Sequence, residues 1–194
     1  MDPHTAAADG EFMDTRTFDA LTESMKSAYV AGLSEGAVPR PVIMPLVRGE
    51  LVGLIWQRPA KNPEDALTAI ASLSNIAAAA NADEIVLAWE THDVATACEL
   101  PAEGPSPCLN MVHATKDGHT LHQFPYAEDA SSAEPLWQPT SAPQPGGALP
   151  APVQAAVDYS FTPLELDHPS PFGVTVVLME EDGYTLRLTE AFAF

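Results

Sequence analysis

Basic residues are scarce in this chain and almost absent beyond Lys61. The sequence has 194 residues, with 8 Lys and Arg against 27 Asp and Glu and a formal net charge of −19. Residues 62–194 hold only Lys116 and Arg187 against 19 of the acids. Such a surface repels nucleic-acid phosphate and anionic lipid, and it attracts basic partners or cations. We therefore expect binding to neither nucleic acid nor a membrane.

Cysteine, aromatic residues and long apolar runs are also sparse. Cys98 and Cys108 are too few for a disulfide framework, so free structural thiols are expected, with a disulfide or a metal role as alternatives. Aromatics make up only 7% of the chain, which predicts a modest core. No apolar run approaches the roughly 20 residues that span a bilayer, and residues 1–14 lack the pattern of a secretory signal. We expect a cytoplasmic protein.

Motifs of catalysis are missing as well. The chain has no G-x-S-x-G nucleophile elbow and neither of the glycine-rich phosphate-binding motifs. Its two cysteines have no basic residue nearby to lower a thiol pKa. The sequence therefore favours a protein that is not an enzyme.

The patterns that are present predict an α+β fold. We expect an antiparallel-rich sheet built from β-hairpins, two covering helices and a Pro-rich irregular insertion. The expected organisation is a flexible tail at 1–13, a main α+β domain at 14–126, a Pro-rich linker or insertion at 127–157, and C-terminal strands at 158–194 that pack on the same domain.

Local signals place the elements of this fold. A helix is predicted from Asp14 or Thr15 to about Leu33, and Asn62 followed by proline and two acids is a strong start for a second helix. Two apolar runs at 42–47 and 50–56 predict a hairpin, in which Pro45 marks an edge strand or a bulge.

A nearly continuous apolar run at 84–89 predicts a central strand that is covered on both sides. Asp117-Gly118 and Asp182-Gly183 stand between apolar stretches and predict two further hairpins.

Histidines in the first of these hairpins carry the metal hypothesis. A two-residue Asp117-Gly118 turn places His113 opposite His122, with Cβ atoms roughly 5 Å apart. Two imidazoles at that distance can share a divalent metal ion, with His92 or Asp93 from the end of the central strand as further ligands. The alternative is two half-exposed strand histidines and no cofactor, since a one-residue slip in register would separate them.

Three further residues are candidates for binding. Arg48 lies at the tip of the first predicted hairpin and Arg58 at its base, where they can pair with acids of the same chain or of a second copy. Trp137 is costly to leave in water, so it either pins the Pro-rich segment onto the domain or contacts a partner.

The segment 82–90 completes a recognisable layout: hairpin, helix, apolar strand ending in Ala-Trp, irregular loop and Asp-Gly hairpin. Over about residues 40–126 this layout resembles small uncharacterised proteins of actinobacterial phages and mobile elements. The resemblance implies a phage or accessory origin, with a location in the host cytoplasm or the virion, and no known activity. It assigns no functional residue.

Together these features favour a non-enzymatic acidic binding or assembly protein that acts through protein–protein contacts. Its partner would be another protein or a second copy of the chain, which would form an oligomer. Two alternatives remain. One is a small metal-dependent hydrolase centred on His113 and His122, and the other is an acidic inhibitor of a basic host protein.

Overall fold

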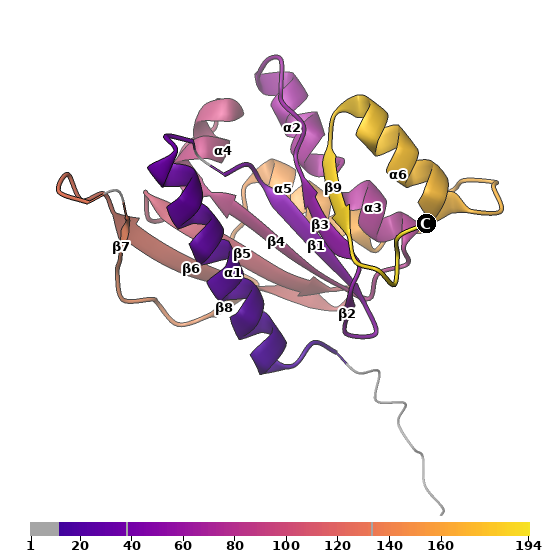
Figure 1. The fold of residues 1–194 in the computed structure, drawn as a ribbon, viewed down its shortest axis with the longest axis horizontal. Helices are drawn as coiled ribbons and strands as arrows, with labels where there is room; N and C mark the ends of the chain where they lie inside the picture. Colours follow the sequence, from indigo (N-terminus) through magenta and orange to yellow (C-terminus); the bar gives the residue numbers. More distant parts are fainter. Residues whose placement is uncertain (1–11, 38, 133) are drawn as a thin grey trace, which may run out of the picture.

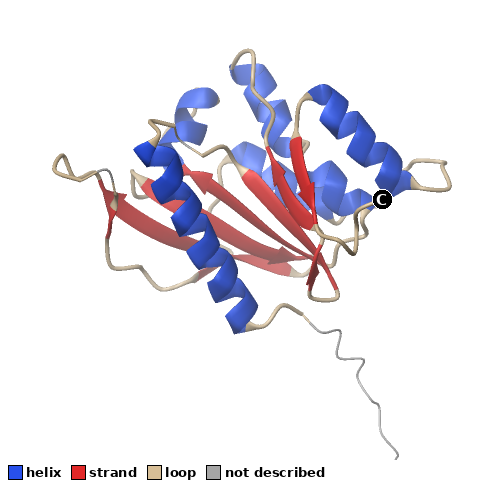
Figure 2. Ribbon diagram, in the orientation of Figure 1, coloured by secondary structure: helices blue, strands red, loops and turns tan. Residues whose placement is uncertain are grey.

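The computed structural model describes residues 12–37, 39–132 and 134–194, so most of the expected tail lies outside the described residues. Within them, one antiparallel sheet of nine strands has the order β7-β6-β5-β4-β1-β3-β9, with β2 paired to β1 and β8 to β6 (Figure 2). The strands are β1 (Val42–Val47), β2 (Glu50–Leu51), β3 (Gly53–Trp56), β4 (Glu84–Glu90), β5 (Cys108–Thr115), β6 (Gly118–Ala127), β7 (Leu136–Trp137), β8 (Gln144–Pro145) and β9 (Thr185–Leu188). The helices are α1 (Thr15–Ser34), α2 (Pro63–Ala71), α3 (Ser74–Ala79), α4 (Thr91–Ala97), α5 (Ala151–Ser160) and α6 (Pro171–Asp182). The fold is α+β with an antiparallel-rich sheet, as the sequence predicts.

Helices cover both faces of the sheet, and the central strand β4 shows why. Val86 and Ala88 point toward α1, whereas Leu87 and Trp89 join the core under α2, α3 and α5. Figure 1 shows α1 lying across one face, with α2, α3 and α5 across the other. All seven residues of β4 are buried, which confirms the prediction of a central strand covered on both sides.

The two helices predicted from capping signals are present. Asp14 caps α1 by accepting a hydrogen bond from the Thr17 N–H at 2.7 Å. Asn62 does the same for the Asp65 N–H at 2.8 Å at the start of α2. The apolar stripe after Asn62 is divided between two short helices, α2 and α3.

Pro45 lies in an internal strand, so the expectation of an edge strand is wrong. Strand β1 pairs with β4 on one side and with β2 and β3 on the other. The register changes by one residue between the β1–β2 and β1–β3 pairings, so that Val52 and Gly53 both lie opposite Pro45. A bulge is present, but it lies in the partner strand and not in β1 as predicted, and it accommodates a residue that has no N–H to donate.

The predicted C-terminal hairpin at Asp182-Gly183 is wrong, because its first half is the helix α6. Ser170 caps the start of α6, Pro171 occupies the first turn, and Gly183 ends the helix in the left-handed conformation with φ +102°. These signals and packing against α3 outweigh the β-propensity of a valine-rich segment. The second half is the strand β9, as expected, but it pairs with β3.

Helices α4, α5 and α6 are additional to the two covering helices that the sequence predicts. The expected Pro-rich insertion contains the short strands β7 and β8, which pair with β6, and the first turns of α5. It therefore extends the sheet and covers it.

Candidate functional site

The predicted histidine pair is not directly opposed. The hairpin turn is Lys116-Asp117, which places His113 opposite Thr120 and His122 opposite Met111. This register differs from the predicted one by two residues, so both imidazoles stay on the face beneath α1, where the Phe18 ring lies 4.4 Å from His122 and 6.1 Å from His113 between centroids.

His113 has a different partner, the carboxylate of Glu84. Its Nε2 lies 2.6 Å from Oε2 of Glu84, and Oε1 accepts a hydrogen bond from the Met13 N–H at 2.6 Å. The Glu84 side chain is completely buried. Burial, followed by the nearby His113, lowers the pKa of His122. This cluster ties the start of α1 to β4 and β5, a structural role that no sequence pattern predicts.

The other two predicted metal ligands lie at the opposite end of β4. His92 and Asp93 belong to α4, which follows Glu90, whereas His113 pairs with Val86. Four or five extended residues put roughly 15 Å between these groups. Among the residues described, no three His, Cys, Asp or Glu side chains are grouped to hold a metal ion.

A second buried carboxylate, Glu90, accepts backbone hydrogen bonds at the end of β4 where α4 begins. Its Oε2 accepts the Asp93 N–H at 2.7 Å and its Oε1 the Cys108 N–H at 3.3 Å. Burial, and then the charge of Glu90, raises the pKa of Asp93 to about 6. Both cysteines are free and buried, and burial raises the pKa of Cys98 and brings that of Cys108 to about 11, so neither is a reactive thiolate.

Replacing Asp93 with asparagine is expected to stabilise the protein at neutral pH. The pKa is raised in the folded state, so Asp93 contributes stability below its unfolded pKa near 4, and this contribution is lost as the pH rises through about 6. After discounting for the exposed part of the side chain, Asp93→Asn should gain about 1–2 kcal/mol at pH 7.5 and only about a third of that gain at pH 4.5.

Urea unfolding at the two pH values measures this difference. The matched control is Asp19→Asn, which removes an exposed carboxylate of α1 and should change stability little at pH 7.5. A loss of stability in Asp93→Asn at pH 7.5 would contradict the prediction.

The two candidate arginines have different surroundings. Arg58 forms a bidentate pair with Asp65 at 2.7 and 2.8 Å, and its Nε lies 3.0 Å from Oδ2 of Asp182. Its side chain is only 11% exposed, so it pairs with acids of its own chain and offers little to a partner. Arg48 is exposed at the β1–β2 turn, where its N–H donates to Asp83.

Trp137 packs on the domain, as in the first of the two interpretations. It pairs with Tyr126 across β7 and β6, and their ring centroids are 5.5 Å apart. Lys26 of α1 lies 5.4 Å from the indole centroid. The half-buried ring fastens the Pro-rich segment to the edge of the sheet.

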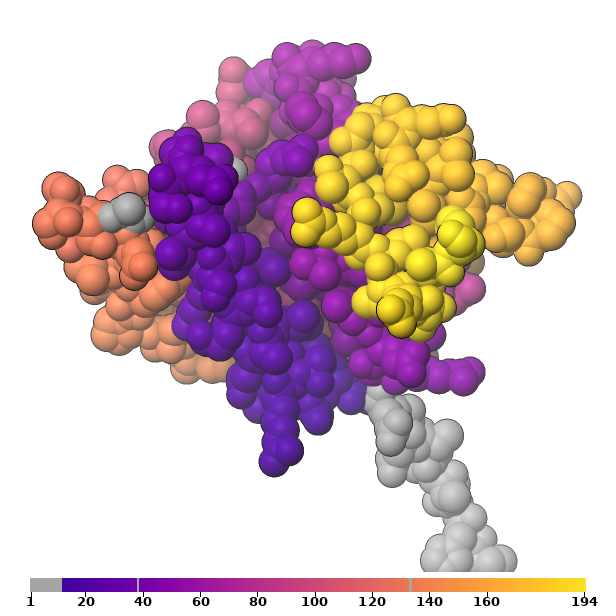
Figure 3. Space-filling model, in the orientation of Figure 1, coloured from indigo at the N-terminus to yellow at the C-terminus, as the bar shows by residue number. Residues whose placement is uncertain are grey.

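An apolar surface lies on the outer side of α6. The residues that share this side at helical spacing are Val174, Val177 and Leu178, and the last two are 49% and 56% exposed. Phe194, 81% exposed, lies beside Gly173 and extends the surface by one turn. We call Val174, Val177, Leu178 and Phe194 the α6 face; Figure 3 shows the C-terminal segment (yellow) exposed over one flank of the molecule.

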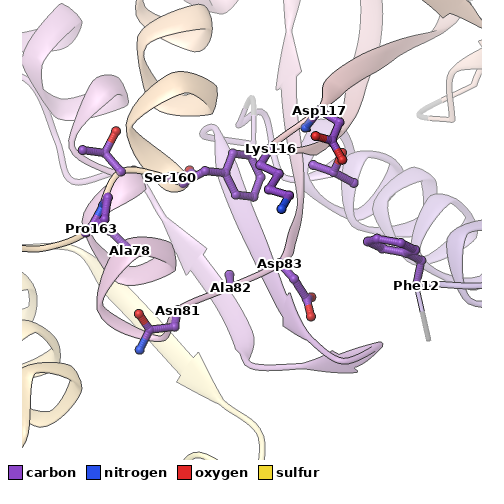
Figure 4. A pocket seen from close by; sticks show the side chains of 12 residues that line it. Phe12, Ala78, Asn81, Ala82, Asp83, Lys116, Asp117, Ser160 and Pro163 are labelled. Atoms are coloured by element: carbon purple, nitrogen blue, oxygen red, sulfur yellow. The ribbon is translucent and has the colours of Figure 1, made fainter. Parts of the chain in front are cut away.

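A groove lies where the β5–β6 turn approaches the end of α5. Its main cavity, of about 360 Å³, is mostly apolar and has Lys116, Asp83 and Asp117 among its lining residues. Figure 4 shows Lys116 reaching from the turn into the space between Phe12 and residues 160–163. A neighbouring cavity of about 310 Å³ shares Ala78 and continues along α3.

No family model, curated protein or solved structure matches this chain. No helix in the described part of the chain is long and apolar enough to cross a membrane. The assignment of function therefore depends on the geometry of the α6 face and the groove, together with the charge.

Proposed function

We propose that this chain is a non-enzymatic binding protein that docks a basic, amphipathic segment of a partner protein onto the α6 face. The observation that carries the proposal is that α6 is apolar on both sides. Thr175, Val176 and Met179 are buried, yet Val177 and Leu178 are about half exposed on the opposite side. Large apolar residues grouped on one exposed helix face are typical of an interaction surface.

Charge beside the α6 face argues for a basic partner. Glu180, Glu181 and Asp182 occupy the last turn of α6, where carboxylates are unfavourable because the helix dipole is negative there. Arg58 compensates Asp182, but neither glutamate has an ion-pair partner within the described residues. Lys or Arg of a bound segment would supply that partner, while its apolar side covers Val177 and Leu178.

A synthetic helical peptide of leucine and lysine provides a defined probe, with a leucine and glutamate peptide as its charge-reversed counterpart. The double variant Val177→Ser/Leu178→Ser should bind the basic peptide at least about tenfold more weakly than the native protein, because about half of each side chain would be buried on binding. Fluorescence anisotropy of the labelled peptides measures the affinities.

Leu136→Ser is the matched control, since Leu136 is 53% exposed but lies on β7. It should leave the affinity unchanged. Glu180→Gln/Glu181→Gln should reduce both the affinity and its dependence on salt. Equal affinity in the Val177/Leu178 variant and the Leu136 variant would overturn the proposal. So would a dimer of the native chain that this double variant abolishes, because a second copy would then occupy the α6 face.

A further inference from the structure

We propose that the groove beneath the β5–β6 turn binds a linear aliphatic monocarboxylate, with the carboxylate at Lys116 and the chain running along α3. This small-molecule site is separate from the α6 face. The two cavities of about 360 and 310 Å³ share Ala78, Thr162 and Pro163, so they adjoin. Lys116 lines only the first, and Leu164 only the second. An elongated ligand can therefore extend from the cation at one end to Leu164 at the other, an end that Ser72, Ser74 and Asn75 also line.

Lys116 supplies the charge that selects a carboxylate. It is one of two basic residues beyond Lys61, and it forms no ion pair within the described ranges 12–37, 39–132 and 134–194. Lys116 is exposed at the mouth of the cavity, and Figure 4 shows its side chain directed into the space between Phe12 and Ser160. An ammonium group next to an apolar cavity is a favourable partner for a carboxylate, because charge-assisted hydrogen bonds strengthen where water is displaced.

Two carboxylates at the same end restrict the ligand to a single negative charge. Both oxygens of Asp83 face the Arg48 N–H, at 2.9 and 3.2 Å, so this group is engaged by the β1–β2 turn. Asp117 adjoins Lys116 on the hairpin turn and also lines the cavity. A phosphate dianion would place a second negative charge near these acids, and a long dicarboxylate would bury its second carboxylate at the far, Leu164 end of the groove, so the site favours a monoanion.

The apolar part of the lining suits an unbranched hydrocarbon chain, although Asn81, Ser160 and Thr162 also border the cavity. Ala78 and Ala82 form a smooth wall at the end of α3, and Phe161 and Pro163 face them from the segment after α5. The combined volume is within the range of small-molecule sites, which are mostly apolar with a few polar groups. Ala78 lines both cavities, so a longer side chain at this position is expected to fill part of the space beside both.

Calorimetric titration with hexanoate, octanoate and decanoate, each below its micellar concentration, tests the proposal. Affinity should rise by about threefold for each added methylene that enters the groove. Decylamine and the dianion of decanedioic acid should bind at least about tenfold more weakly than decanoate. Amide shifts in NMR spectra should appear at Lys116, Ala78 and Thr162.

Three variants identify the source of the affinity. Lys116→Gln should weaken decanoate about tenfold, Lys116→Arg should retain most of the affinity, and Ala78→Met should weaken decanoate while leaving hexanoate nearly unchanged. Lys61→Gln is the matched control for the loss of one positive charge. Equal binding of decanoate and decylamine, an unaffected Lys116→Gln variant, or shifts confined to the α6 face would each overturn the proposal. None of these outcomes affects the peptide-binding test of the α6 face, so the two proposals can fail separately.

Discussion

Removing the buried carboxylate of Glu84 is expected to lower the free energy of unfolding by about 3 kcal/mol. In Glu84→Ala, the Met13 N–H and the His113 imidazole both lose a partner at 2.6 Å. Glu84 is completely buried, so the variant also leaves a cavity between β4 and α1. Lost charge-assisted hydrogen bonds and the cavity each cost roughly 1–3 kcal/mol. Urea unfolding at pH 7 measures the total.

Two further variants, Glu84→Gln and His113→Gln, separate the effect of the lost hydrogen bonds from the effect of the cavity. Glu84→Gln retains an acceptor for the Met13 N–H and most of the volume, so it should cost about half as much as Glu84→Ala. A double-mutant cycle that combines Glu84→Ala with His113→Gln should give a coupling energy of about 1 kcal/mol between the two side chains. The same cycle started from the Glu84→Gln variant should give a much smaller coupling energy, because the amide is neutral. Hydrogen exchange should show α1 opening first. A Glu84→Ala protein as stable as the native one would contradict the anchoring role.

The sequence predicts the parts of this fold that have local causes. Asp14 and Asn62 carry their own helix-starting chemistry, and both caps are observed with the expected backbone donors. The apolar run at 84–89 allows no exposed face, so its central position follows from composition alone. These predictions hold because each depends on residues within one turn or one strand.

Features that depend on distant residues cannot be predicted from local sequence patterns. The Asp182-Gly183 pair predicts a hairpin turn, but Gly183 ends a helix, because α3 and β9 offer that helix a packing surface. Likewise, Asp117-Gly118 is a turn signal, yet the turn forms one residue earlier, at Lys116-Asp117. That shift separates His113 from His122 and leads His113 to Glu84, more than twenty residues away in sequence.

The candidate sites also divide into those that local sequence predicts and those that depend on distant residues. Trp137 is correctly expected to pack on the domain, since an isolated indole is costly to expose. The α6 face is missed, because a segment assigned to strands gives no reason to examine its helical spacing. The groove at Lys116 is missed as well, because its walls come from α3, the β5–β6 turn and the end of α5. Only the scarcity of cations beyond Lys61 gives a sequence-level reason to examine Lys116.

Replacing Arg58 with methionine is expected to lower the free energy of unfolding by about 2 kcal/mol. The guanidinium joins three elements: it follows β3, pairs with Asp65 in α2, and lies 3.0 Å from Asp182 at the end of α6. It also lies 5.9 Å from the centroid of the Tyr184 ring. Methionine retains part of the packing but leaves two carboxylates near each other without a cation. A bidentate pair that is largely shielded from water is worth more than an ordinary surface pair.

The pH dependence of this variant gives the sharper test. The hydrogen bonds from Arg58 hold the pKa of Asp65 well below its ordinary value, so the pair contributes stability above the unfolded pKa near 4 and loses it as the pH falls through the lowered folded-state value. The difference between the native protein and Arg58→Met should therefore be constant from about pH 8 to 5 and should narrow below about pH 4. Arg48→Met, which removes an exposed arginine, is the control and should change stability little at any pH. A difference that persists unchanged at pH 3 would mean that Arg58 acts through packing and not through its charge.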